Sequence, residues 1–124
     1  MKIRMLNNSI RFRLKEPEVK LFRQTGSITE ALEFGAAAED QLRFTLQAVP
    51  DASLSASFQH NAVTIYVPLA TAEKWTGSDM IGFDGSIDTA KGKIIRVLVE
   101  KDFKCLDGRE EDNEGAYPNP QVVC

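Results

Sequence analysis

Residues 8–14 read Asn-Ser-Ile-Arg-Phe-Arg-Leu, and residues 61–67 read Asn-Ala-Val-Thr-Ile-Tyr-Val. Both stretches alternate apolar and polar side chains with a period of two, which is typical of a half-buried strand. Each is followed by a short helical stretch that ends at a Thr-Gly pair, Thr25-Gly26 in the first case and Thr76-Gly77 in the second. The repetition predicts two copies of one unit, each with a hairpin, a short helix and two further strands.

The two copies align at an offset of 53 residues, which pairs Phe12 with Ile65 and Phe22 with Trp75, whereas the Thr-Gly pairs match only if two residues are dropped. Alternation also recurs by chance, so true duplication and a coincidental likeness both stay open. The length of 124 residues fits a single domain, with pseudo-repeats at about 2–50 and 54–103 and an acidic, proline-rich tail at 104–124. We expect an α+β fold in which duplicated ββαββ units form a curved antiparallel sheet or a small barrel with two short helices.

The composition argues against several classes of protein. The net charge is −3 and 27% of the residues are charged, so neither a general affinity for nucleic acid nor wholesale disorder is expected. No apolar run is long enough to span a membrane, and the N-terminal residues lack the apolar core of a signal peptide. We therefore expect a cytoplasmic protein that binds neither nucleic acid nor membrane, with Cys105 and Cys124 reduced.

The first hairpin carries an unusual concentration of positive charge. With Asn7-Asn8 as its turn, Lys2 lies opposite Arg13, and Arg4 lies opposite Arg11. These four cations, called the basic face below, then share one side of the hairpin. Like charges directly opposed across a strand pair are unfavourable, whereas a good pair contributes about 0.2–1 kcal/mol.

The second hairpin has no such charges. Its equivalent pairs are Ser55 with Tyr66 and Ser57 with Thr64. Because one copy of the unit does without the cations, the fold does not require them. The difference between the hairpins is therefore the main lead to a function.

Three explanations of the basic face stay open. In the first, the long side chains extend into solvent and salt screens them. In the second, an acidic element of the same chain covers them; the candidates are Glu100, Asp102, Glu110, Glu111 and Asp112. In the third, the face binds an external anion, because arginine recognises phosphate and carboxylate groups bidentately. The partner would then be a phosphate-bearing small molecule or an acidic partner.

No catalytic or metal-binding pattern stands out. Cys105 is a candidate nucleophile only if His60, the one histidine, lies beside it, and a buried inert cysteine is the simpler interpretation. The paired Cys and His spacing of zinc sites is absent, as is the EF-hand spacing. We assign no catalytic residue, no metal site and no cofactor.

The two ends of the chain carry motifs that resemble one protein family. The first is Met1-Lys-Ile-Arg with residues 8–14, and the second is Val99-Glu-Lys-Asp-Phe-Lys-Cys-Leu, followed by Glu111-Asp and Tyr117-Pro-Asn-Pro. Over nearly the whole chain they resemble a family of small, functionally uncharacterised bacterial proteins. The resemblance implies a bacterial, cytoplasmic source and no known activity.

A duplicated antiparallel unit with alternating charged residues is also similar to the triphosphate-tunnel (CYTH-like) proteins. That resemblance implies polyphosphate binding inside an eight-stranded barrel, with Mg²⁺ held by acidic residues. Their N-terminal strand carries Glu-x-Glu-x-Lys, whereas the matching strand here, Lys2-Ile-Arg-Met, has no glutamate. We therefore expect a non-enzymatic binding module with an anion-compatible basic face. A Mg²⁺-dependent phosphate- or polyphosphate-processing enzyme of the tunnel type is the alternative.

Overall fold

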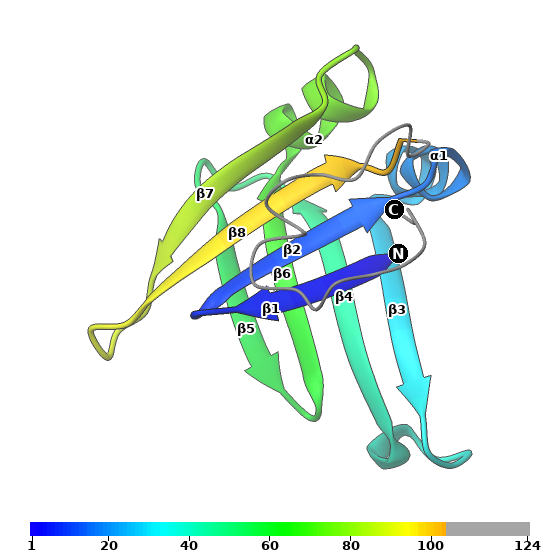
Figure 1. Ribbon diagram of the computed structural model, residues 1–124, viewed down its shortest axis with the longest axis vertical. Helices are drawn as coiled ribbons and strands as arrows, with labels where there is room; N and C mark the ends of the chain where they lie inside the picture. The colour runs from blue at the N-terminus through cyan, green and yellow to red at the C-terminus, as the bar shows by residue number, and fades with distance from the viewer. Residues whose placement is uncertain (104–124) are drawn as a thin grey trace, which may run out of the picture.

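The element order ββαββ occurs twice along the chain (Figure 1). The computed structural model describes residues 1–103. The first unit contains β1 (Lys2–Leu6), β2 (Ser9–Leu14), α1 (Glu16–Thr25), β3 (Ser27–Glu33), a 3-10 turn (Ala38–Asp40) and β4 (Gln41–Val49). The second unit contains β5 (Ser55–Gln59), β6 (Ala62–Pro68), α2 (Leu69–Thr76), β7 (Gly82–Asp88) and β8 (Ile94–Lys101). The predicted α+β class with duplicated ββαββ units is confirmed.

The two units exchange hairpins. Sheet A has the strand order β1-β2-β8-β7, and sheet B has the order β3-β4-β6-β5. Each helix carries the chain from one sheet to the other, so each sheet takes one hairpin from each unit. The sheets pack face to face with their strands crossing, and both helices lie near one end of the sandwich (Figure 1).

The expected antiparallel sheet or small barrel is wrong in two respects. At the centre of each sheet the pairing is parallel, between β2 and β8 and between β4 and β6. Within residues 1–103, each sheet also keeps two open edge strands, so no closed barrel forms. The central pairing joins residues as far apart as Arg13 and Glu100, 87 positions along the chain, which no local pattern encodes. The single domain over 1–124 stays a prediction.

Both outer hairpins turn in the same way. Asn7 and Asn8 have φ of 49° and 59°, and His60 and Asn61 have φ of 51° and 60°. Positive φ at both central residues is the type I′ turn, whose twist matches that of the flanking strands. Asparagine tolerates this conformation better than most residues. The two turns stand at the 53-residue offset predicted for the units.

Local signals define both ends of α1. Pro17 lies in the first turn, and the Glu18 carboxylate accepts a hydrogen bond of 2.8 Å from the Lys15 N–H. At the other end Gly26 adopts φ of 77° and its N–H donates to the Phe22 carbonyl at 2.8 Å. The helix therefore ends at the Thr25-Gly26 pair, as the sequence predicts.

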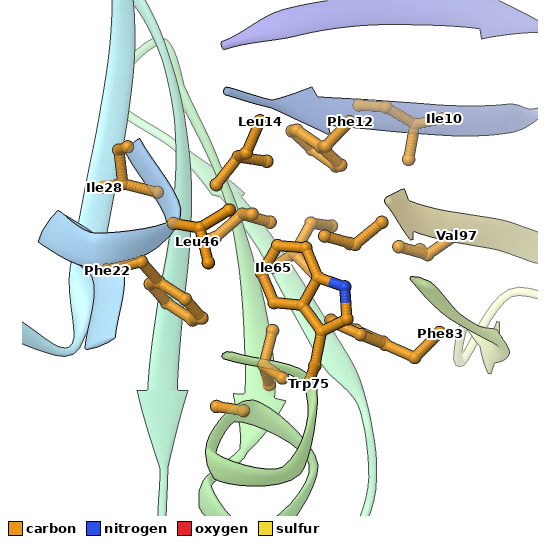
Figure 2. Close-up of a cluster of buried hydrophobic side chains, with 14 of the residues drawn as sticks. Ile10, Phe12, Leu14, Phe22, Ile28, Leu46, Ile65, Trp75, Phe83 and Val97 are labelled. Atoms are coloured by element: carbon orange, nitrogen blue, oxygen red, sulfur yellow. The ribbon is translucent and has the colours of Figure 1, made fainter. Parts of the chain in front are cut away.

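The core lies between the two sheets and beneath the helices. Trp75 reaches from α2 into the space between the sheets, with Phe22 on one side and Phe83 on the other (Figure 2). Its ring centroid lies 6.3 Å from that of Phe22 and 5.4 Å from that of Phe83. The indole N–H, although buried, donates to the Ile81 carbonyl at 3.0 Å. Phe22 and Trp75, which the offset of 53 residues pairs, thus both lie in the core.

Candidate functional site

The first hairpin brings the four cations of the basic face onto one side of sheet A. β1 and β2 pair in the predicted register, with Lys2 opposite Arg13 and Arg4 opposite Arg11. Phe12, between the two arginines of β2, is fully buried in the core. Because side chains alternate along a strand, the cations lie on the outer face of the sheet. The predicted pairs of like charge are confirmed.

Glu100 contacts this face from β8. The parallel pairing sets it beside Arg13, whose Nε donates to its carboxylate Oε1 at 2.8 Å. The Arg11 Nε lies 3.7 Å from the same oxygen. Glu100 is only 8% exposed, so these interactions are less screened by water than those of a surface ion pair.

Asp102 is the second carboxylate on the face, with its Oδ2 3.1 Å from the Lys2 Nζ. Among the described residues, Glu100 and Asp102 thus supply two negative charges against four positive charges. The other expected counterparts, Glu110, Glu111 and Asp112, lie outside the described residues, as does Cys105.

Arg96 and Asp84 extend the charged surface, and sequence reasoning missed both. They line a hollow of about 510 Å³ on the outer side of sheet A, together with Arg11. Their place depends on the pairing of β8 with β2 and β7, which is a tertiary feature. The sequence offers one signal that could have found Arg96. It lies four positions before Glu100, and residues an even number of positions apart on a strand share a face.

The outer side of sheet B carries hydroxyl groups where sheet A carries charges. Thr29, Thr45, Thr64 and Ser57 lie at one register level across its four strands, and are called the hydroxyl face below. The Oγ1 atoms of Thr29 and Thr45 lie 2.7 Å apart. The Ser57 Oγ lies 2.9 Å from the Tyr66 hydroxyl. The two hairpins thus share the same turn and register, but one presents charged side chains and the other presents uncharged hydroxyl groups.

The α-ammonium group of Met1 anchors the strand that carries Lys2. It donates hydrogen bonds to Glu18 on α1 and to Glu30 on β3, the latter at 2.7 Å. Burial alone would lower the pKa of the ammonium, but these hydrogen bonds outweigh it and raise that pKa above its usual 8.0. Burial alone would raise the pKa of Glu18, but hydrogen bonds from the ammonium and from the Lys15 N–H lower it below 4.5. The start of β1 is therefore held against both α1 and β3.

His60 lies exposed in the second hairpin turn. Among residues 1–103, no group of three or more His, Cys, Asp or Glu side chains is arranged to hold a metal ion. In the same part of the chain, none of the helices is long and apolar enough to cross a membrane.

Comparison with known proteins places the chain in a family. No curated protein matches it, and no solved structure does. The likeness to the triphosphate-tunnel proteins therefore stays a resemblance. One family model matches residues 1–121, which is nearly the whole chain. This agrees with the expected membership of an uncharacterised family: the chain belongs to a family of unknown function, DUF7009.

Proposed function

We propose that this protein is a non-enzymatic binding module that recognises an anionic ligand through its basic face. One observation carries the proposal. At the same register positions of two hairpins with the same turn, one hairpin has two opposed pairs of cations and the other has hydroxyl groups. Since the fold forms with either set, the cations are best explained by a ligand.

The contacts of Glu100 support this proposal, because they illustrate how the face accepts an anion. One carboxylate oxygen interacts with two guanidinium groups, at 2.8 Å and 3.7 Å. Planar guanidinium groups suit carboxylate and phosphate oxygens alike. The hollow beside Arg11 adds a further cation, Arg96, next to the same surface, together with the carboxylate of Asp84. A ligand with several negative charges matches this spread of cations better than a single small anion does.

The test replaces cations with the residues that the second hairpin carries at the equivalent positions. Arg4→Ser and Arg11→Thr, made together, install the Ser57 and Thr64 pair, which the same strand geometry accommodates. Calorimetry would measure the binding of inorganic triphosphate and of a glutamate-rich peptide at low salt. We expect the double variant to bind at least one of them about tenfold more weakly or worse, because two charge-assisted contacts are lost.

A matched control removes two positive charges elsewhere. Arg43→Thr on sheet B and Lys74→Ser on α2, made together, change the net charge by the same amount. We expect this control to bind as the unaltered protein does. Equal weakening in both double variants would contradict the basic face as the site and would indicate a general charge effect.

The enzyme alternative is tested with the same triphosphate in the presence of Mg²⁺. A binding module releases no phosphate under these conditions. Mg²⁺-dependent release that the Arg4→Ser and Arg11→Thr variant abolishes would replace the binding proposal with a phosphate-processing enzyme.

A shortened chain tests whether the ligand of the basic face is a segment of the protein itself. Residues 107–114 contain five acidic side chains, which match the charge of the basic face. If this segment is the ligand, a chain that ends at Phe103 melts at a lower temperature, and added sulfate restores part of the loss. Unchanged melting would exclude the segment as the ligand and leave an external anion.

A further inference from the structure

The two sheets separate at the end of the sandwich away from the helices. β2 and β6 run from their hairpin turns toward α1 and α2, so the turns lie at the opposite end (Figure 1). There a cavity of about 580 Å³ opens between the sheets, with Ile10 and Ile95 of sheet A on one wall and Val63 of sheet B on the other. Pockets that bind small molecules typically have 300–1,000 Å³.

The cavity exists because the side chains at this end are too small or too exposed to fill it. Near the helices, Phe12, Leu14 and Trp75 are fully buried. Toward the turns, Ala56 lines the wall, whereas Ile3 stands at the equivalent position of the first unit. Apolar atoms that face an open space lack dispersion contacts on one side, and an apolar ligand would supply them.

The lining determines the chemistry of the ligand. None of the described residues that line the cavity carries a charge, in a chain that is 27% charged. Met5 and Phe58 flank the mouth and are 65% and 74% exposed, which leaves large apolar side chains in water. The rim adds the side-chain amides of Asn7 and Asn8 and the hydroxyl of Thr89. The Asn8 Nδ2 donates to the Ile94 carbonyl and the Thr89 Oγ1 to the Lys93 carbonyl, so the amide oxygens remain to accept from a ligand. A cavity of this kind favours an apolar body with one uncharged polar end.

We propose that this cavity is a second binding site, which takes an uncharged ligand with a single hydrocarbon chain. The chain lies between the two sheets, and its hydroxyl or similar neutral end lies at the rim of amides and hydroxyls. A charged head group is disfavoured, because no described lining residue would compensate for its loss of water. This site faces the interior of the sandwich, so it is separate from the basic face on the outside of sheet A.

Straight-chain alcohols test the proposal, with octanol, decanol and dodecanol as probes below their solubility limits. Saturating decanol is expected to raise the melting temperature by about 5 °C or more, since a ligand that binds only the folded state stabilises it. Calorimetry is expected to give a negative heat-capacity change, the mark of apolar burial. Decanoate, which adds a charge at the same chain length, is expected to bind more weakly.

One substitution narrows the cavity. Ala56→Ile introduces the side chain that Ile3 provides at the equivalent position, and we expect at least about a tenfold loss of decanol affinity, because the larger side chain projects into the space that the hydrocarbon chain would occupy. Ala31→Ile is the matched control, since it adds the same atoms on the exposed outer side of sheet B. The melting temperature without ligand reports whether each variant folds.

Three results would overturn the proposal. The first is an unchanged melting temperature with every alcohol, and the second is unaltered decanol binding by Ala56→Ile. The third is tighter binding of decanoate than of decanol, which would exclude an uncharged ligand. Sedimentation adds a further check: a dimer that Phe58→Ser dissociates, with no alcohol bound, would identify the mouth as a contact between two copies of this chain instead.

Discussion

The outer surfaces of the two sheets share a framework and differ in chemistry. Sheet A presents the basic face with Glu100 beside it, and sheet B presents the hydroxyl face with Gln47 at the position equivalent to Glu100. The hairpins have the same turn conformation and the same register. The backbone therefore tolerates either set of side chains, and the charges of sheet A are an addition to the fold rather than a condition for it.

Glu100 is the residue on which this difference depends most. It is nearly buried and contacts two arginines, whereas Gln47 is exposed. A carboxylate between guanidinium groups offsets the repulsion among the cations of the basic face. The hydroxyl face carries no like charges and needs no such carboxylate. We expect three changes to differ in effect from their counterparts at the equivalent positions, beginning with this carboxylate.

The largest effect is expected from Glu100→Ala. It removes the carboxylate that contacts Arg11 and Arg13 in a partly buried setting, and we expect a loss of about 2–3 kcal/mol in the free energy of unfolding. Gln47→Ala is the counterpart on sheet B and should change stability by less than about 0.5 kcal/mol. Urea denaturation measures both. Similar losses in the two variants would mean that the faces do not differ energetically.

An intermediate effect is expected from Glu18→Gln, which keeps the hydrogen bond to the Lys15 N–H but removes the charge that faces the Met1 ammonium. We expect a loss of about 1 kcal/mol near neutral pH. Because folding lowers the pKa of Glu18, its contribution is present above the ordinary value of 4.5 and is lost as the pH falls through its folded pKa.

The difference in stability between Glu18→Gln and the unaltered protein should therefore shrink as the pH is lowered below 4.5. Folding raises the pKa of the ammonium, so its contribution is present below 8.0 and declines as the pH rises above that value. Thr71 stands at the equivalent position of α2, and Thr71→Val provides a control whose effect should not vary with pH. A constant difference across the acidic range would exclude the charge contact.

The smallest effect is expected from moving the cations to sheet B. Ser57→Arg and Thr64→Arg, made together, recreate the Arg4 and Arg11 pair on the second hairpin and should cost about 0.5–1 kcal/mol at low salt. High salt should recover most of the loss, because it screens exposed charges. Adding Gln47→Glu should also recover part of it, by supplying the equivalent of Glu100. A salt-independent loss would indicate a packing defect instead of repulsion.

Much of the local structure was predictable, because local forces set it. Alternation over residues 9–14 and 62–67 predicts the strands, and the Asn7-Asn8 turn predicts the register of the first hairpin. Pro17 and Gly26 mark the ends of α1 through their own backbone preferences. Turns limit the strands beside them: β8 begins at Ile94, since Gly92 has φ of 75° and belongs to the preceding turn.

The partners of the basic face were only partly predictable. Their negative charge made Glu100 and Asp102 candidates, but charge alone could not rank them above the acidic residues of the tail. Their contacts with Arg13 and Lys2 require β8 to lie beside β2 in parallel register. Arg96 and Asp84 depend on the same pairing.

Only the tertiary structure sets three features of this protein. They are the exchange of hairpins, the parallel strands at the sheet centres and the cavity away from the helices. A turn or a cap is decided by backbone sterics and hydrogen bonds within a few residues. The pairing of β2 with β8 is decided by which arrangement buries the apolar sides of four hairpins together, and those side chains are distant along the chain. Local patterns in the sequence carry the first kind of information, and only the packed molecule carries the second.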